Sequence, residues 1–93
     1  MITFSARLKK AQRAGNLTVA DLARWFDRNY QTVRGWVSGA CEPGGAPMDR
    51  EHALELLGLL EQMIKRRQKF PVPRLSPIER VAYIQELREQ LFP

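Results

Sequence analysis

The segment from Asn29 to Ser38 places hydrogen-bonding side chains at positions that would line the outer side of a short helix. These side chains belong to Asn29, Tyr30, Gln31, Arg34 and Ser38. Glutamine pairs with adenine and arginine with guanine through two hydrogen bonds, whereas tyrosine offers a ring to a thymine methyl group and a hydroxyl to a phosphate. Val33 and Trp36, at i and i+3, would face inward. Gathered on one side of a short helix, these side chains have the hydrogen-bonding groups that base recognition requires.

Catalytic chemistry finds little support in the same sequence. The chain has one His and one Cys, so no Ser/His/Asp or Cys/His set with additional partners is available. No glycine-rich phosphate loop joins a strand to a helix, and no pair of acids lies in an apolar setting. His52 is interpreted as a surface histidine and Cys41 as an incidental thiol. We therefore expect no enzyme, no cofactor, no metal and no small-molecule substrate.

The composition indicates a basic, packed domain. The chain has 93 residues, 44% of them hydrophobic, and a net charge of +5. Seven Lys or Arg against three Asp or Glu lie in residues 1–48, so the positive charge is concentrated toward the N-terminal half, as is typical of a polyanion-binding protein. A single cysteine excludes a disulfide scaffold, and no apolar run approaches the ~18 residues of a membrane span. We expect a cytoplasmic protein without a membrane partner.

Local signals predict three short helices in the N-terminal half. The first would run from about Thr3, its N-cap, to Ala14, ending at Gly15. The second would begin at Thr18, with Asp21 completing a capping box, and the third would cover residues 30–37 after an Asn29 cap and end at Gly39. Phe26 and Trp36 are predicted to lie in the core. For Trp25 two interpretations stay open: partial burial against the first or fourth helix, or exposure on a partner surface.

Two further helices are predicted in the C-terminal half. Residues 39–47 form a Gly- and Pro-rich loop, and residues 49 to 66 or 69 form a helix with a wide apolar face. Residues 70–77 alternate with proline and form an extended link, after which Ser76, Pro77 and Glu79 begin a last helix that ends near Leu91. Its apolar stripe comprises Ile78, Val81, Ile84, Leu87 and Leu91. We predict an all-α, five-helix protein.

The segment from Val19 to Gly39 resembles the helix-turn-helix of the phage repressor and Cro family. The matching positions are Leu22, Ala23, Val33, Trp36 and Gly39. Ala23 must be small because the two helices cross there at close range. The chain departs from the family at Asp27, where the tight turn usually has glycine, and at Val19, where a phosphate-gripping glutamine often stands. Asp tolerates the left-handed conformation better than most residues do.

The resemblance implies that the second helix of this motif lies in the major groove of DNA. Base contacts would come from Asn29, Tyr30, Gln31, Arg34 and Ser38. Phosphate contacts would come from Thr18, Arg24, Arg28, Thr32, Arg7, Lys10 and Arg13. For the basic side chains of the first helix, and for the run from Lys65 to Lys69, a solvated surface is the alternative to phosphate contact.

These features predict a sequence-specific binder of double-stranded DNA. The family resemblance implies that it is a phage or bacterial transcriptional regulator, a repressor. Residues 1–69 would form the DNA-binding domain, and residues 70–93 a proline-rich link and helical arm for homo-oligomerisation. Two alternatives stay open. One is a small terminase subunit that recognises viral DNA for packaging and assembles a ring, and the other is a protein-interaction module such as an antitoxin-like or scaffold protein.

Overall fold

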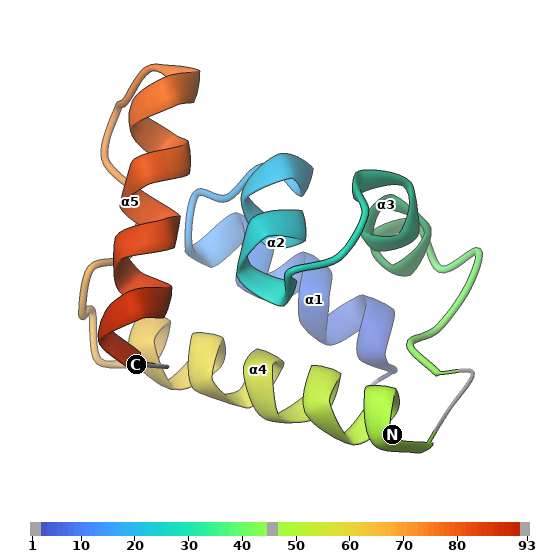
Figure 1. The fold of residues 1–93 in the computed structure, drawn as a ribbon. Helices are drawn as coiled ribbons and strands as arrows, with labels where there is room; N and C mark the ends of the chain where they lie inside the picture. The colour runs from blue at the N-terminus through green and yellow to red at the C-terminus, as the bar shows by residue number, and fades with distance from the viewer. Residues whose placement is uncertain (1–2, 45–46, 92–93) are drawn as a thin grey trace.

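The computed structural model describes residues 3–44 and 47–91, and within these residues the chain is helical without strands. The elements are α1 (Phe4–Ala14), α2 (Val19–Phe26), α3 (Tyr30–Ser38), α4 (Pro47–Lys65) and α5 (Pro77–Leu91) (Figure 1). The all-α prediction is confirmed. None of the helices described here has both the length and the apolarity to cross a bilayer.

The beginnings of the first three helices follow the predicted capping residues. The Thr3 hydroxyl accepts a hydrogen bond from the backbone N–H of Ala6, and the Asn29 side chain accepts one from Gln31. Thr18 and Asp21 form a complete capping box, in which each side chain accepts from the backbone N–H of the other. These bonds satisfy N–H groups that have no partner within the helix.

Three helix ends use a left-handed residue other than glycine. Asn16, Asp27 and Arg67 each have φ of 53° or 54°. At each end, the backbone N–H of the left-handed residue and that of the following residue donate to carbonyl oxygens of the last helical turn, as in the Schellman motif. The first predicted helix therefore turns at Asn16, one residue beyond Gly15, and α4 ends at Lys65, short of the predicted residues 66 to 69. Asp27 adopts the left-handed turn expected of it.

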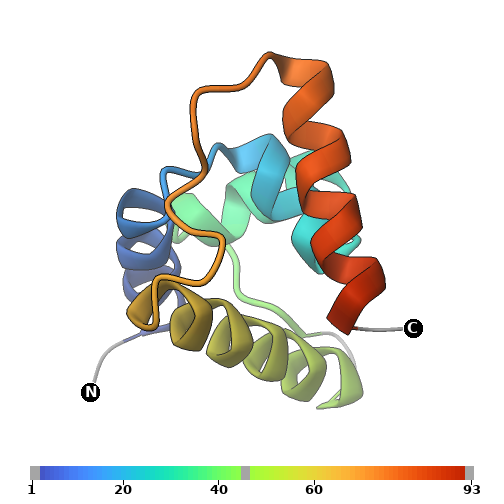
Figure 2. The same ribbon diagram turned by 90° about the vertical axis from the view of Figure 1, so that its left-hand side faces the viewer.

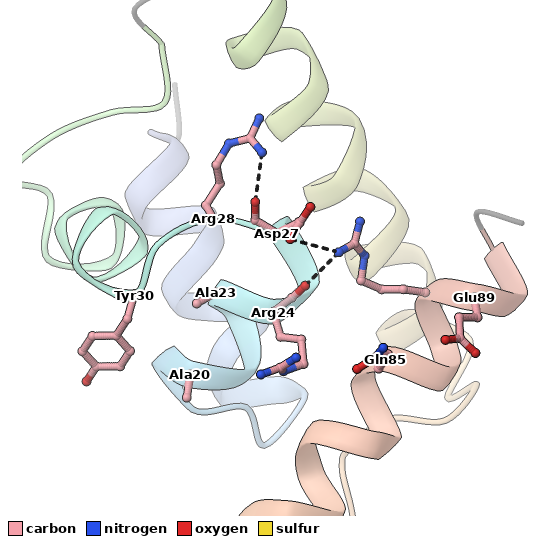
Figure 3. Close-up of a pocket in the computed structure, with 9 residues that line it drawn as sticks. Ala20, Ala23, Arg24, Asp27, Arg28, Tyr30, Gln85 and Glu89 are labelled. Atoms are coloured by element: carbon pink, nitrogen blue, oxygen red, sulfur yellow. Dashed lines mark hydrogen bonds and ion pairs between the residues drawn. The ribbon is translucent and has the colours of Figure 1, made fainter.

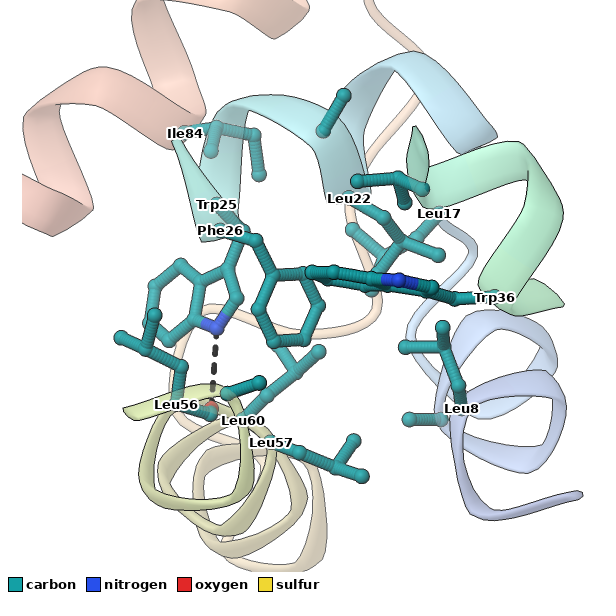
Figure 4. Packing of buried hydrophobic residues seen from close by; sticks show 14 of the residues in the cluster. Leu8, Leu17, Leu22, Trp25, Phe26, Trp36, Leu56, Leu57, Leu60 and Ile84 are labelled. Atoms are coloured by element: carbon teal, nitrogen blue, oxygen red, sulfur yellow. Dashed lines mark hydrogen bonds between the residues drawn. The ribbon is translucent and has the colours of Figure 1, made fainter. Parts of the chain in front are cut away.

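The core lies where α1, α2 and α3 meet above α4 (Figure 4). Phe4, Phe26 and Trp36 form an aromatic group, with ring centroids 5.5–6.3 Å apart. Leu56, Leu57 and Leu60 from α4 close the core from below, and the predicted burial of Phe26 and Trp36 is confirmed.

Trp25 is completely buried, and its Nε1–H donates to the carbonyl oxygen of Leu56 at 3.0 Å. Its indole thus connects α2 to α4. The interpretation of Trp25 as a partner surface was wrong, because both the ring and its polar atom are used within the chain.

The C-terminal segment, predicted as a proline-rich link and helical arm, packs on the rest of the domain. Phe70 and Val72 of the link and Ile84 and Leu87 of α5 belong to the same buried cluster as the core of residues 4–60. Figure 2 shows the link crossing from α4 to α5 along one side of the molecule, with α5 against α2.

The predicted apolar stripe of α5 is divided between core and solvent. Ile84 and Leu87 are buried, whereas Ile78 is 83% exposed and Val81 and Leu91 are about two-fifths exposed. Because the middle positions of the stripe pack within the chain, only its outer positions remain exposed for the predicted homo-oligomer contact.

Candidate nucleic-acid interface

A three-residue connection, Asp27 to Asn29, joins α2 to α3 and holds the two helices in close contact. The left-handed Asp27 reverses the chain at the end of α2, and Asn29 immediately caps α3. Phe26 and Trp36 lie edge to face, with Val33 fully buried beside them. A short connection and a dry contact surface restrict how far α3 can move relative to α2.

The outward side of α3 is exposed along its whole length. Exposed residues are Asn29, Tyr30, Gln31, Thr32, Arg34 and Ser38. The Asn29 side chain caps the helix and the Ser38 hydroxyl donates to the Gly35 carbonyl, so both are oriented locally. Within the described residues, the side chains of Gln31 and Arg34 make no hydrogen bond or ion pair, which leaves their donors and acceptors directed to solvent. Tyr30 is 47% exposed.

One edge of this outward side is formed by the loop that follows α3. The backbone N–H of Cys41 donates to the Gly35 carbonyl at 3.3 Å. A Cβ atom added to Gly35 would lie 2.5 Å from the Cys41 sulfur, too close for the Cys41 side chain to keep its position. Gly35 therefore admits the returning loop. The sequence offered no signal for this contact, because only the path of the loop brings the two residues together.

The other edge of α3 opens into a groove of about 560 Å³ between α2 and α5 (Figure 3). Its lining residues are Ala20, Ala23, Arg24, Asp27, Arg28, Tyr30, Gln85, Arg88 and Glu89. The groove has three guanidinium groups against two carboxylates. No residue of α5 was predicted for the site, because the sequence does not indicate that α5 packs against α2.

Two of the groove arginines are oriented by backbone carbonyl groups at the C-terminal end of α2. Arg28 donates through Nη1 to the Asp27 carbonyl at 3.0 Å, and Arg88 donates to the Arg24 carbonyl at 3.2 Å. Arg88 also lies 3.9 Å from the Asp27 carboxylate. Arg24 is exposed and, among the residues described, its guanidinium has no ion-pair partner. Arg24 and Arg28 thus lie beside the N-terminal end of α3.

The other predicted phosphate contacts are distributed unevenly. Thr18 and Thr32 are exposed, although the Thr18 hydroxyl already caps α2. Arg7 forms a two-bond ion pair with Glu61 of α4, with nitrogen–oxygen distances of 3.1 and 2.5 Å. These bonds raise the pKa of the Arg7 guanidinium. Arg7 therefore faces α4, where its guanidinium is paired with a carboxylate.

Lys10 and Arg13 also belong to surfaces on α1. Lys10 lines one hollow together with Glu61 and Lys65 of α4, and a second with Lys9 and Arg13. The structure groups the cations of α1 with those of α4, separately from the exposed residues of α3. Sequence reasoning placed them all in one interface because charge alone does not indicate which side of a helix meets which neighbour.

Among residues 3–44 and 47–91, no three or more His, Cys, Asp or Glu side chains gather where a metal ion could bind. Comparison with models of protein families, with curated proteins and with solved structures finds no match to this chain.

Proposed function

We propose that this protein binds double-stranded DNA in a sequence-specific manner by inserting α3 into the major groove, with α2 and α3 acting as a helix-turn-helix. The observation that carries the proposal is the exposed outer side of α3 on a helix whose inner side is fully packed. A helix held in this way presents its polar side in one direction, so that little backbone conformational entropy is lost when the side chains meet the bases.

The proposal gives distinct roles to two groups of side chains. Gln31 and Arg34, whose polar atoms are directed to solvent, read adenine and guanine edges, and Tyr30 contacts a thymine methyl group or the adjoining sugar. Arg24 and Arg28, beside the start of α3, contact the phosphates that flank the groove. Asn29 and Ser38 contribute through the atoms that their local hydrogen bonds leave available.

A transcriptional regulator of phage or bacterial type is the role that we favour. One recognition helix reads only a few base pairs, so a regulator of this kind normally uses two helices about 34 Å apart on a two-fold axis. We therefore retain a homo-oligomer as a prediction. Fewer apolar residues are available for this contact than the sequence indicated, because most apolar residues of α4 and α5 pack within the chain. Leu59, Ile78, Val81 and Leu91 remain exposed for a second copy.

Measurement of particle mass in solution separates the possible roles. A dimer supports regulation, whereas a large ring supports the small-terminase alternative. A monomer at high concentration contradicts both forms of assembly.

The DNA-binding proposal itself is tested by selecting fragments from a random duplex library and then measuring their affinity over a range of salt concentrations. We expect a defined sequence to be enriched and its affinity to fall steeply with salt, because bound phosphates release counterions. The double variant Gln31→Ala/Arg34→Ala should lose the preference for that sequence. The matched control Gln62→Ala/Arg50→Ala changes two exposed residues of α4 and should retain it.

Failure to enrich any sequence, or an affinity that does not respond to salt, would contradict the proposal and favour the protein-interaction alternative.

A further inference from the structure

A second positively charged surface lies at the C-terminal ends of α1 and α4. We call it the α1–α4 patch, and it consists of Lys9, Lys10, Arg13, Lys65, Arg66 and Arg67. All six residues are exposed. Two adjoining hollows connect four of them, since Lys10 lines one with Lys65 and the other with Lys9 and Arg13, and Arg66 and Arg67 follow Lys65 directly in the chain. Residues from two helices that are distant in sequence therefore form one continuous charged surface.

The α1–α4 patch and the outer side of α3 lie on different sides of the molecule. α1 packs against α3 near its own N-terminus, where the Ser5 hydroxyl donates to the Val37 carbonyl at 3.0 Å. It packs against α4 through Arg7 and Glu61 and, at its end, where a Cβ atom on Gly15 would lie 3.2 Å from Ile64. In Figure 1, α3 lies above α1 and α4 runs below it, with the C-terminal end of α4 furthest from α3. The patch therefore extends from α1 toward the end of α4 that lies away from α3.

The positive charge of the patch is not neutralised within the described chain. Glu61, the carboxylate that lines one of its hollows, already accepts hydrogen bonds from Nε and Nη2 of Arg7. None of the six patch residues forms an ion pair with a described acidic group. Like charges gathered on one exposed surface repel one another and attract a polyanion.

We propose that the α1–α4 patch binds the phosphate backbone of a second DNA duplex, so that one chain connects two DNA segments. This inference rests on the proposed function of α3. The patch offers flexible Lys and Arg side chains around hollows lined by Ala11, Ala14 and Ile64, with no Asn, Gln or aromatic side chain among its members. Contacts of this type neutralise phosphates without reading bases. Binding at the patch is therefore independent of sequence and more sensitive to salt than to base composition.

A two-stage capture experiment tests the inference. The protein is first loaded on an immobilised duplex that carries its selected sequence, and a labelled duplex of unrelated sequence is then added. Wild-type protein should retain the labelled duplex. The variant Lys10→Gln/Lys65→Gln should stay on the first duplex but lose most of the second. Its logarithmic salt slope for the second duplex should fall by about 2, because each phosphate contact contributes about 0.9.

A control variant with the same loss of charge is Arg50→Gln/Arg74→Gln, which changes two exposed residues outside both surfaces. It should capture the second duplex as wild type does. Equal thermal unfolding of all three proteins establishes that no difference arises from folding. All four side chains are exposed, so we expect equal unfolding temperatures.

The outcomes separate this inference from the function on which it rests. Loss of wild-type protein from the first duplex refutes the function of α3 and the bridging together. Retention on the first duplex without capture of the second refutes bridging alone. Equal capture by the Lys10→Gln/Lys65→Gln variant also refutes it, because the second duplex is then held elsewhere, for example by another copy of α3. Binding of vesicles rich in phosphatidylserine without capture of a second duplex assigns the patch to lipid and overturns the inference.

Discussion

Arg80 of α5 donates two hydrogen bonds, of 3.0 and 2.6 Å, to one carboxylate oxygen of Asp21 in α2. The same oxygen accepts the backbone N–H of Thr18, which completes the cap of α2. Arg80 donates further to the Asn16 carbonyl, and Asn16 in turn donates to the carbonyl of Val72. One ion pair thus attaches the C-terminal helix to the beginning of the helix that supports α3. The unit that presents α3 therefore includes α5.

Replacing Asp21 by alanine should destabilise the protein by about 3 to 5 kcal/mol, because the substitution leaves a poorly exposed guanidinium without its carboxylate. The side chains of Asp21 and Arg80 are only 5% and 16% exposed. The free energy of unfolding in urea measures the loss. The double variant Asp21→Ala/Arg80→Met should lose less than Asp21→Ala alone, and a larger loss would show that Arg80 stabilises the fold through its bond to the Asn16 carbonyl even without Asp21.

Trp25→Phe should destabilise the protein by about 1 to 3 kcal/mol through the lost hydrogen bond to Leu56 and the space left by the smaller ring. Trp36→Phe is the matched control, since Trp36 is also buried and forms no described hydrogen bond through its indole nitrogen. We expect the Trp25 variant to lose about 1 kcal/mol more in urea unfolding. Equal losses would mean that the Trp25 hydrogen bond makes no net contribution.

Asp27→Gly should stabilise the protein by about 0.5 to 1 kcal/mol. Asp27 has φ of 53° and ψ of 50°, a conformation that costs an L-residue about 1 to 2 kcal/mol and glycine very little, although glycine also gives the unfolded chain more freedom. Its carboxylate is 80% exposed at 3.9 Å from Arg88, so little electrostatic stabilisation is lost. Thermal unfolding reports the change, and a lowered midpoint would indicate a larger role for the Asp27 carboxylate.

Arg34→Ala should reduce affinity for the selected sequence by about 1 to 3 kcal/mol and relax the preference at one base pair. Arg24→Ala should instead weaken binding to all sequences alike and make the logarithmic salt slope shallower by about 0.9. Binding to a set of single-base variants of the selected site distinguishes these patterns. The same pattern for both substitutions would contradict the separate roles proposed for these arginines.

The Glu79 carboxylate should make stability depend on pH at the beginning of α5. Hydrogen bonds from the backbone N–H and hydroxyl of Ser76 lower the pKa of Glu79 below its ordinary value of 4.5. A carboxylate with a lowered pKa in the folded state stabilises the fold above the ordinary value and loses this contribution as the pH falls through the folded value. Between pH 6 and pH 3, wild type should therefore lose more stability in urea unfolding than Glu79→Gln does. An equal loss would show that this capping bond does not form in solution.

Local interactions made the beginnings of the helices predictable from the sequence. The Thr18 hydroxyl accepts a hydrogen bond from the backbone N–H of Asp21, and the Ser76 hydroxyl accepts one from that of Glu79. Each bond spans only three residues, so it forms wherever the chain becomes helical. The left-handed Asp27 follows from the same local chemistry, because aspartate tolerates that conformation and the chain must reverse between α2 and α3. The helical spacing of Val33 and Trp36 among polar residues likewise predicted which side of α3 is buried.

Contacts between residues distant in the chain were not predictable in this way. The ion pairs Arg80–Asp21 and Arg7–Glu61 join residues separated by 59 and 54 positions. Each pairs a charged side chain with a partner that the sequence does not indicate. The sequence presents Arg7 as a candidate phosphate contact, whereas the structure pairs its charge with that of Glu61.

The sequence by itself thus determined the helices, their caps and the polar side of α3, because these depend on neighbours within one or two turns. Only the tertiary structure decided that α5 packs on α2, that Trp25 is buried and that the cations of α1 join those of α4. Such contacts depend on how the apolar sides of several helices share one core, and helical periodicity indicates that a side is buried without indicating its partner.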